Sequence, residues 1–195
     1  MAVTISAYAL VTEAEASEYL GITPAVNSDV MRRLINAVTA LIEKTLRREF
    51  KQRTYTETYD GSGGGSLFLK HFPIISVTSV ERLDEDGTTA DTLTTSDYWS
   101  VDAIGEIRAK TAVAFWKADQ NYKVVYSAGF ATIPDDVAQV ALQLIARAYR
   151  DRDKKREDVQ SVTLDRETTR YTKADRIKTI REELGHYYIP AMVRQ

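Results

Sequence analysis

The sequence predicts an α+β protein, an α-helical bundle of two long and two shorter helices with a small antiparallel β insertion between the long helices. Three observations support this fold class. An apolar stripe of helical spacing runs through residues 28–50, and a second begins at Pro134. A block rich in glycine, threonine and tyrosine separates the two stripes and shows the period of two that is typical of strands.

The short first helix is predicted from a capping box. Thr12 can cap the amide of Glu15, and the Glu15 carboxylate can reach back to the amide of Thr12. Gly21 ends the helix, since glycine readily adopts the left-handed conformation that follows a last turn. This helix and the long helix that follows make residues 1–52 the N-terminal helices of the bundle.

The first long helix is predicted over residues 28–50. Its apolar side chains recur every three or four residues, at Val30, Met31, Leu34, Ile35, Val38, Leu41, Ile42 and Leu46. Such spacing places them on one side of an α-helix, which therefore packs against the core. We expect Leu34 to be a core residue that faces Leu144 on the second long helix.

Residues 53–128 form the predicted β insertion. Tyr55, Glu57 and Tyr59 alternate with threonines, a composition that favours a strand. Residues 60–66 are rich in glycine and are typical of a hairpin loop. Further short strands are expected at 67–69, 74–80, 98–101, 106–108 and 122–126.

The second long helix is predicted from about Pro134 to Asp151, within a segment of the bundle that spans residues 129–156. Its stripe consists of Val137, Val140, Ala141, Leu144, Ile145 and Ala148. Residues 157–195 are expected to form a C-terminal extension with a short helix at about 173–184. We expect the four segments to make one domain overall.

The chain ends in an apolar, aromatic segment that contains Tyr187, Tyr188 and Ile189. It follows a charged link with weak periodicity, a pattern typical of a segment that orders when it binds a partner. The alternative is that the last helix simply completes the bundle.

Charge is unevenly distributed along the chain although the net charge is only −2. Residues 1–30 contain four acids and no base, whereas residues 31–53 contain seven bases and two acids. Segregated charge suits a subunit that docks against copies of itself or against other proteins. Arg47, Arg48, Lys51 and Arg53 are therefore candidate interface or channel charges. A solvated face and contact with DNA phosphates are the alternatives.

The sequence argues against catalysis. Without cysteine the chain has no disulfide, thiolate or cysteine-zinc chemistry. Its two histidines, His71 and His186, are far apart in sequence. The glycine-rich loop lacks the Gly-Lys-Ser/Thr ending of a phosphate loop, and Arg82 and Leu93 stand where a calcium loop needs ligands. We expect no enzyme, no catalytic, cofactor-binding or metal site, no cofactor and no membrane partner.

Several short motifs follow one another along the chain. They are Thr12–Ala16, Tyr19–Ile22, Leu46–Phe50, Tyr55–Gly61, Leu67–Ile74, Val77–Val80, Tyr122–Phe130 and Ile133–Val137. The ordered set resembles the head–tail connector (adaptor) family of tailed bacteriophages, of the lambda-like siphophage type. The resemblance covers most of residues 10–150.

The resemblance implies a structural protein of the virion neck that is made in the host cytoplasm. Identical subunits would form a ring, a dodecamer in the virion, bound beneath the portal protein at the capsid vertex. The ring would extend the DNA channel, let genomic DNA pass without sequence specificity, and offer a platform to head–tail stopper and tail proteins. Its helices would build the ring wall and its C-terminal segment, with Tyr187, Tyr188 and Ile189, would clasp the portal.

Three other functions stay open at this point. The chain could be another oligomeric virion neck protein that also works by assembling. It could instead be a non-specific DNA-binding module, or an uncharacterised enzyme. Ring-shaped particles formed with portal protein would separate the connector from these last two.

Overall fold

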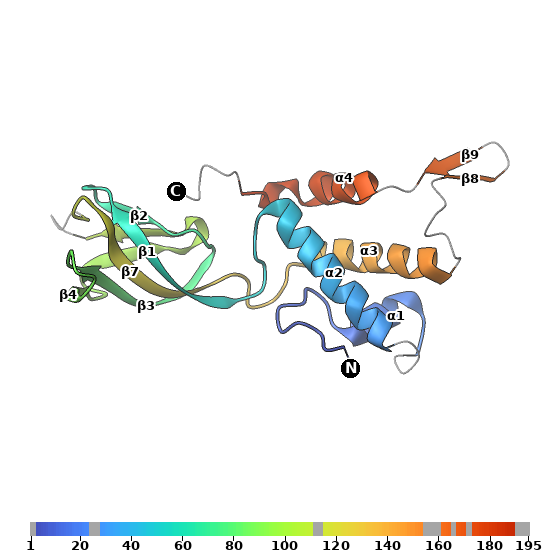
Figure 1. The fold of residues 1–195 in the computed structure, drawn as a ribbon, viewed down its shortest axis with the longest axis horizontal. Helices are drawn as coiled ribbons and strands as arrows, with labels where there is room; N and C mark the ends of the chain where they lie inside the picture. The colour runs from blue at the N-terminus through green and yellow to red at the C-terminus, as the bar shows by residue number, and fades with distance from the viewer. Residues whose placement is uncertain are drawn as a thin grey trace. The chain divides into compact units, whose positions relative to one another are not determined.

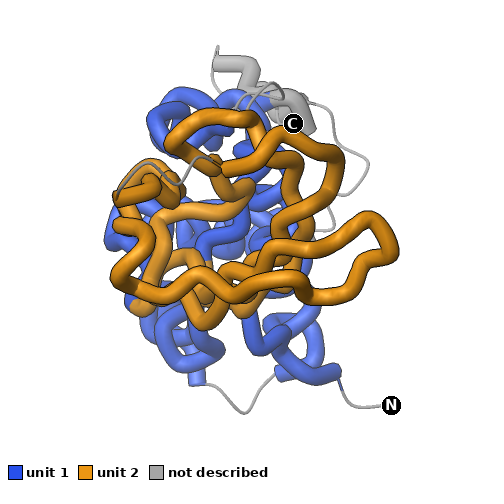
Figure 2. The backbone as a smooth tube through the Cα atoms, turned by 90° about the vertical axis from the view of Figure 1, so that its left-hand side faces the viewer, with its two compact units in different colours: residues 1–50, 132–190 blue, residues 51–131, 191–195 orange. Residues whose placement is uncertain are grey.

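The protein is described by a computed structural model over residues 3–23, 28–110, 115–153, 161–164, 167–170 and 173–189. The chain separates into two compact units, coloured differently in Figure 2. Unit 1 comprises residues 1–50 and 132–190, and unit 2 comprises residues 51–131 and 191–195. The chain therefore leaves the helical unit, builds the β unit, and returns to complete the helical one.

Unit 1 contains all four of the α-helices found in the described part of the chain (Figure 1): α1 (Glu13–Leu20), α2 (Ser28–Leu46), α3 (Asp135–Asp153) and α4 (Lys173–Leu184). Helix α2 contacts α1, α3 and α4. Between α3 and α4, strands β8 (Ser161–Leu164) and β9 (Glu167–Arg170) pair as an antiparallel hairpin. A short 3-10 helix, η2 (Gly185–Tyr187), follows α4.

The start and end of α1 are as predicted. The Glu15 amide donates to the Thr12 hydroxyl at 3.2 Å, and the Thr12 amide donates to the Glu15 carboxylate at 2.6 Å. Gly21 has φ 67°, the left-handed conformation expected after the last turn. The capping box is confirmed.

The core of unit 1 contains buried apolar residues from all four helices. Leu144 on α3 is 2% exposed, which confirms it as a core residue. Leu34 is only half-buried, so the expectation that it lies in the core is wrong. The physical reason is the position of the stripe: its centre passes through Ile35 and Ile42, both fully buried, and Leu34 lies at its flank.

The N-terminal segment, residues 3–11, runs along α2 and is held by polar side chains of that helix. The Asn36 side-chain amide accepts from the Ser6 amide and donates to the Thr4 carbonyl, both at 2.9 Å. The Leu10 amide donates to the Thr39 hydroxyl at 3.3 Å. These bonds satisfy backbone groups that have no strand partner, so the segment is part of unit 1.

Unit 2 contains two antiparallel sheets. The first has the order β1-β7-β3-β4, with β1 (Arg53–Gly61), β7 (Ala118–Ala128), β3 (Ile74–Leu83) and β4 (Thr89–Leu93). The second has the order β2-β6-β5, with β2 (Ser66–Phe68), β6 (Glu106–Ala109) and β5 (Tyr98–Val101). The short 3-10 helix η1 (Asp102–Ile104) joins β5 to β6.

The prediction of a helical bundle with a small β insertion is wrong. The described residues form an α+β protein with four helices, two antiparallel sheets that together contain seven strands, and the β8–β9 hairpin, so sheet is a main component. The strands have a core of their own: Tyr59, Leu67, Leu69, Ile74, Val80, Tyr98, Ile107, Phe115, Tyr122, Val124, Tyr126 and Ala128. An apolar core of this extent stabilises the β unit by itself, so the strands are more than a small insertion in a helical bundle.

The misjudgement has two causes in the sequence. Strands β1, β3 and β7 have 9, 10 and 11 residues, longer than predicted. Strand β4 was missed altogether, because its residues are mostly exposed and so show no alternation of apolar and polar side chains.

Candidate functional site

The described residues present no cluster of potential metal ligands. Among them, no group of three His, Asp or Glu side chains lies close enough to hold a metal ion. The His71 ring stacks on Tyr55 at 3.9 Å, and His186 Nε2 lies 3.2 Å from an Asp136 oxygen. None of the helices in the described ranges is long and apolar enough to cross a membrane. The candidate sites are therefore surfaces.

The first surface is the C-terminal cluster, defined as Arg48, Phe50, Asp136, His186 and Tyr187. The Tyr187 ring meets the Phe50 ring edge to face at 5.3 Å between centroids. The Arg48 guanidinium carbon lies 5.5 Å from the centre of the Tyr187 ring, and the Tyr187 hydroxyl donates to Asp136 at 3.3 Å. The cluster joins the segment after α2, the first turn of α3 and the end of the chain into one structure.

Burial shapes the electrostatics of this cluster. It lowers the pKa of the Arg48 guanidinium, because desolvation disfavours the charged form, while nearby Tyr187 opposes the shift. It also raises the pKa of the Tyr187 phenol, with further contributions from the Asp136 carboxylate. The guanidinium of Arg48 lies over the Tyr187 ring, and the cation–π attraction between them offsets part of the desolvation cost of the buried charge.

The last described residues split into an anchored and an exposed part. The Ile189 amide donates to the Leu46 carbonyl at 3.1 Å, and its side chain is buried. Tyr188 is 42% exposed and borders a shallow pocket of about 400 Å³, which Leu46, Arg181 and Gly185 also line. Ile180 and Leu184 of α4 are fully buried. The structure thus favours the alternative in which the last helix completes the helical unit.

The four predicted basic residues have different environments. Arg47 is exposed and takes a left-handed conformation with φ 54° directly after α2. Arg48 is half-buried in the C-terminal cluster, so the structure brings together two candidates, Arg48 and Tyr187, that the sequence had treated separately. In unit 2, Lys51 forms an isolated parallel bridge with Phe130, and Arg53 opens β1.

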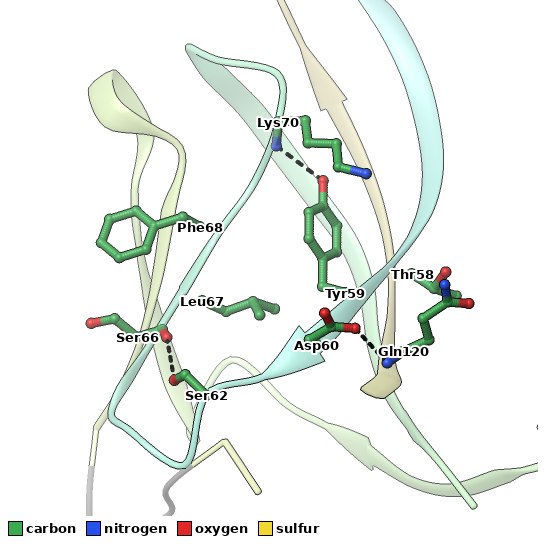
Figure 3. Close-up of a pocket in the computed structure, with 9 residues that line it drawn as sticks. All are labelled: Thr58, Tyr59, Asp60, Ser62, Ser66, Leu67, Phe68, Lys70 and Gln120. Atoms are coloured by element: carbon green, nitrogen blue, oxygen red, sulfur yellow. Dashed lines mark hydrogen bonds between the residues drawn. The ribbon is translucent and has the colours of Figure 1, made fainter. Parts of the chain in front are cut away.

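A second candidate site is a pocket of about 290 Å³ in unit 2 (Figure 3). It is lined by Thr58, Tyr59, Asp60, Ser62, Ser66, Leu67, Phe68, Lys70 and Gln120. Its wall groups bond to one another: the Gln120 amide donates to Asp60 at 2.6 Å, and the Lys70 amide donates to the Tyr59 hydroxyl at 3.0 Å. These hydrogen bonds hold the wall of the pocket in place, and its lining mixes polar and apolar side chains.

A buried polar network supports the wall of this pocket. The hydroxyls of Tyr59 and Tyr126 both donate to the Glu57 carboxylate, at 2.5 and 2.7 Å. The amides of Lys70 and His71 donate to the same two hydroxyls. Burial raises the pKa of the Tyr59 phenol, as does the hydrogen bond to Glu57, and burial is also the main cause of the raised pKa of Tyr126. The network fixes the connection between β2 and β3.

Sequence reasoning missed the exposed aromatic residues of unit 2. Phe68, Trp99 and Trp116 are 57%, 54% and 63% exposed. Lys110 lies 5.7 Å from the Trp99 ring, and Arg82 lies 4.5 Å from the Trp116 ring. Strand alternation was the available signal, since a core position for Tyr98 turns Trp99 outward. Exposed tryptophan is enriched in binding hot spots, so these rings indicate protein contacts.

Comparisons with known proteins found one matching family model and several similar solved structures. A family model described as HCP, head completion protein, matches residues 9–188. A chain in the neck of an empty GTA particle, computed with C6 symmetry, has a TM-score of 0.65 at 17% identity, covering 97% of this chain and 95% of that chain. A chain in the neck of a native GTA particle, computed with C12 symmetry, has a TM-score of 0.62 at 16% identity, covering 97% and 94%.

A third chain comes from the virion of a native gene transfer agent (GTA) particle, with a TM-score of 0.58 at 18% identity and coverage of 93% of both chains. At such low identity these three likenesses show the fold alone. A comparison with curated proteins found no match.

Proposed function

The chain belongs to the head completion protein family, and from that premise we propose that it is a structural connector in the neck of a tailed virus particle. The observation that carries the proposal is the family match over residues 9–188. The fold, shared with chains from the neck of GTA particles, supports the same location. The role is mechanical and contains no catalytic step.

The proposed working form is a ring of identical subunits, a dodecamer, seated beneath the portal. The similar chains belong to necks computed with C6 and C12 symmetry, which supports a closed ring. Closed rings require two different surfaces on each subunit that meet head to tail. The segregated charge of this chain supplies such surfaces.

The proposed channel carries genomic DNA through the ring without reading its sequence. Arg47, Arg48, Lys51 and Arg53 remain the candidate charges for the channel or the subunit interface. Arg48 serves first to hold the C-terminal cluster together, through its contact with Tyr187. Arg47 is the exposed member of the set.

The portal-facing element is proposed to be the end of unit 1, with Tyr187, Tyr188 and Ile189. Tyr187 and Ile189 pack on their own unit and so shape this end. Tyr188, exposed beside its apolar pocket, is left to contact the portal. A preformed surface of this kind loses less entropy on docking than a disordered clasp does. The opposite side of the ring would receive the stopper and tail proteins.

The test is completion of heads in vitro. DNA-filled heads that contain portal but lack this chain are mixed with the purified protein and then with tails. We expect the treated heads to retain DNA under nuclease digestion and to acquire tails, whereas heads treated with buffer do not. Treated heads that stay tailless and leak DNA like the buffer control would refute the proposal.

A further inference from the structure

Unit 2 carries an ordered acidic arm, defined as residues 84–92 at the end of the β3–β4 hairpin. Every residue from Asp84 to Thr92 is exposed. The turn is nevertheless well bonded: the Asp84 amide donates to the Thr88 carbonyl at 2.9 Å, and the Thr88 amide donates to the Asp86 carboxylate at 3.0 Å. The arm therefore holds its conformation while its side chains remain available to a partner.

The charge of this arm has one sign. Between Arg82 and Arg108 the chain has no Lys, Arg or His and contains seven acids: Asp84, Glu85, Asp86, Asp91, Asp97, Asp102 and Glu106. Four of these acids lie on the arm itself. Such a concentration of like charge is stabilised when an opposite charge approaches it.

Unit 1 carries a complementary basic stripe, defined as Arg33, Ala37, Ala40, Lys44 and Arg47. Arg33, Ala37, Ala40 and Lys44 recur every three or four residues, so they share one side of α2, and Arg47 directly follows the helix. All five are exposed. The remaining exposed residue of the helix is Asp29, whose carboxylate accepts from the Val3 amide. The two alanines leave room for a neighbouring backbone between the cations.

We propose that the acidic arm of one copy docks on the basic stripe of the next copy, so that identical subunits join head to tail. The inference rests on the proposed ring and names the surfaces that close it. Opposite charges on two different patches give a heterologous contact, which is the kind that generates rings.

DNA phosphates are the competing occupant of the basic stripe. A protein that binds DNA through charge alone is usually basic overall, whereas this chain has a net charge of −2. The chain also supplies the matching acidic element itself. These two observations favour a second copy.

Charge reversal tests the contact. The arm variant is Asp84→Lys with Glu85→Lys, which spares the Asp86 carboxylate that organises the turn. The stripe variant is Arg33→Glu with Lys44→Glu, which spares Arg47 and its left-handed backbone. The control is Glu18→Lys with Asp119→Lys, which makes the same charge change as the arm variant at exposed positions of α1 and β7. Circular dichroism confirms that each variant is folded.

Each variant is added to portal-containing heads that lack this chain, and bound copies per head are measured. We expect the arm and stripe variants each to bind at least about tenfold less than the unaltered protein, because like charges then face each other. An equimolar mixture of the two should restore assembly, since each reversed arm then meets a reversed stripe. The control should bind normally.

Other results would overturn the inference. If both reversed variants assemble normally, the acidic arm does not dock on the basic stripe. A combined quadruple variant that assembles while the mixture does not places the arm on the stripe of its own chain. The stripe variant could assemble on heads that then fail to retain DNA, while the arm variant behaves like the unaltered protein. That result would show that the basic stripe contacts DNA and not the acidic arm. If the unaltered protein fails to bind heads, the proposed function itself fails.

Discussion

At the scale of single residues, burial separates side chains that the sequence treats alike. Leu144→Ala should lower the free energy of unfolding of unit 1 by about 2–5 kcal/mol, because it empties a fully packed site. Leu34→Ala should cost less than about 2 kcal/mol, because that side chain is half-exposed already. Urea unfolding followed by the helical circular dichroism signal measures both. Equal losses would show that α2 packs on a different side.

The paired phenols of unit 2 give a pH prediction. Burial raises the folded-state pKa of Tyr59 and Tyr126 above the ordinary phenol value of about 10. A raised pKa means that the folded state holds the proton more tightly, so this contribution is complete below about pH 10 and is lost as pH rises further. Stability should therefore fall above about pH 10, and less steeply in the double variant Tyr59→Phe/Tyr126→Phe.

The slope of unfolding free energy against pH between roughly 9.5 and 11.5 is the quantity to compare. Tyr19→Phe is a suitable control because Tyr19 is 41% exposed. Its slope should match that of the unaltered protein. A double variant with the same slope as this control would contradict the assignment.

Among the elements, α4 is the one whose role the structure changes most. Ile180 and Leu184 are fully buried, so deletion of residues 173–195 should expose the core of unit 1 and lower its unfolding midpoint. Tyr188→Ala should leave that midpoint unchanged and weaken binding to portal-containing heads instead. Thermal unfolding and head binding, measured in parallel, separate the two effects. A truncated protein of full stability would restore the idea of a loose clasp.

Elements that are marked by a local sequence pattern could be predicted, whereas features that depend on contacts between distant residues could not. The capping box of α1 and the apolar stripe of α3 depend on neighbours in sequence, and both are confirmed. The predicted β unit is too small, because strand β4 forms by pairing with β3 and its own composition does not indicate a strand. The packing of Arg48 on Tyr187 joins residues far apart in the chain, and no local pattern reveals it.

At the scale of the whole molecule, the family assignment confirms the head–tail connector resemblance drawn from ordered motifs. No one of those motifs is specific alone. Their order follows the path of the chain, from helices through a β unit and back to helices. Composition and charge could point to assembly, but they could not identify the particle.

We propose that this chain forms a ring in the neck beneath the portal. Cryo-electron microscopy of heads completed with the purified protein, averaged around the portal axis, tests it most directly. We predict ring density directly below the portal that accommodates repeated copies of this fold and is missing from untreated heads. Portal vertices that look identical with and without the protein would rule out the proposed ring.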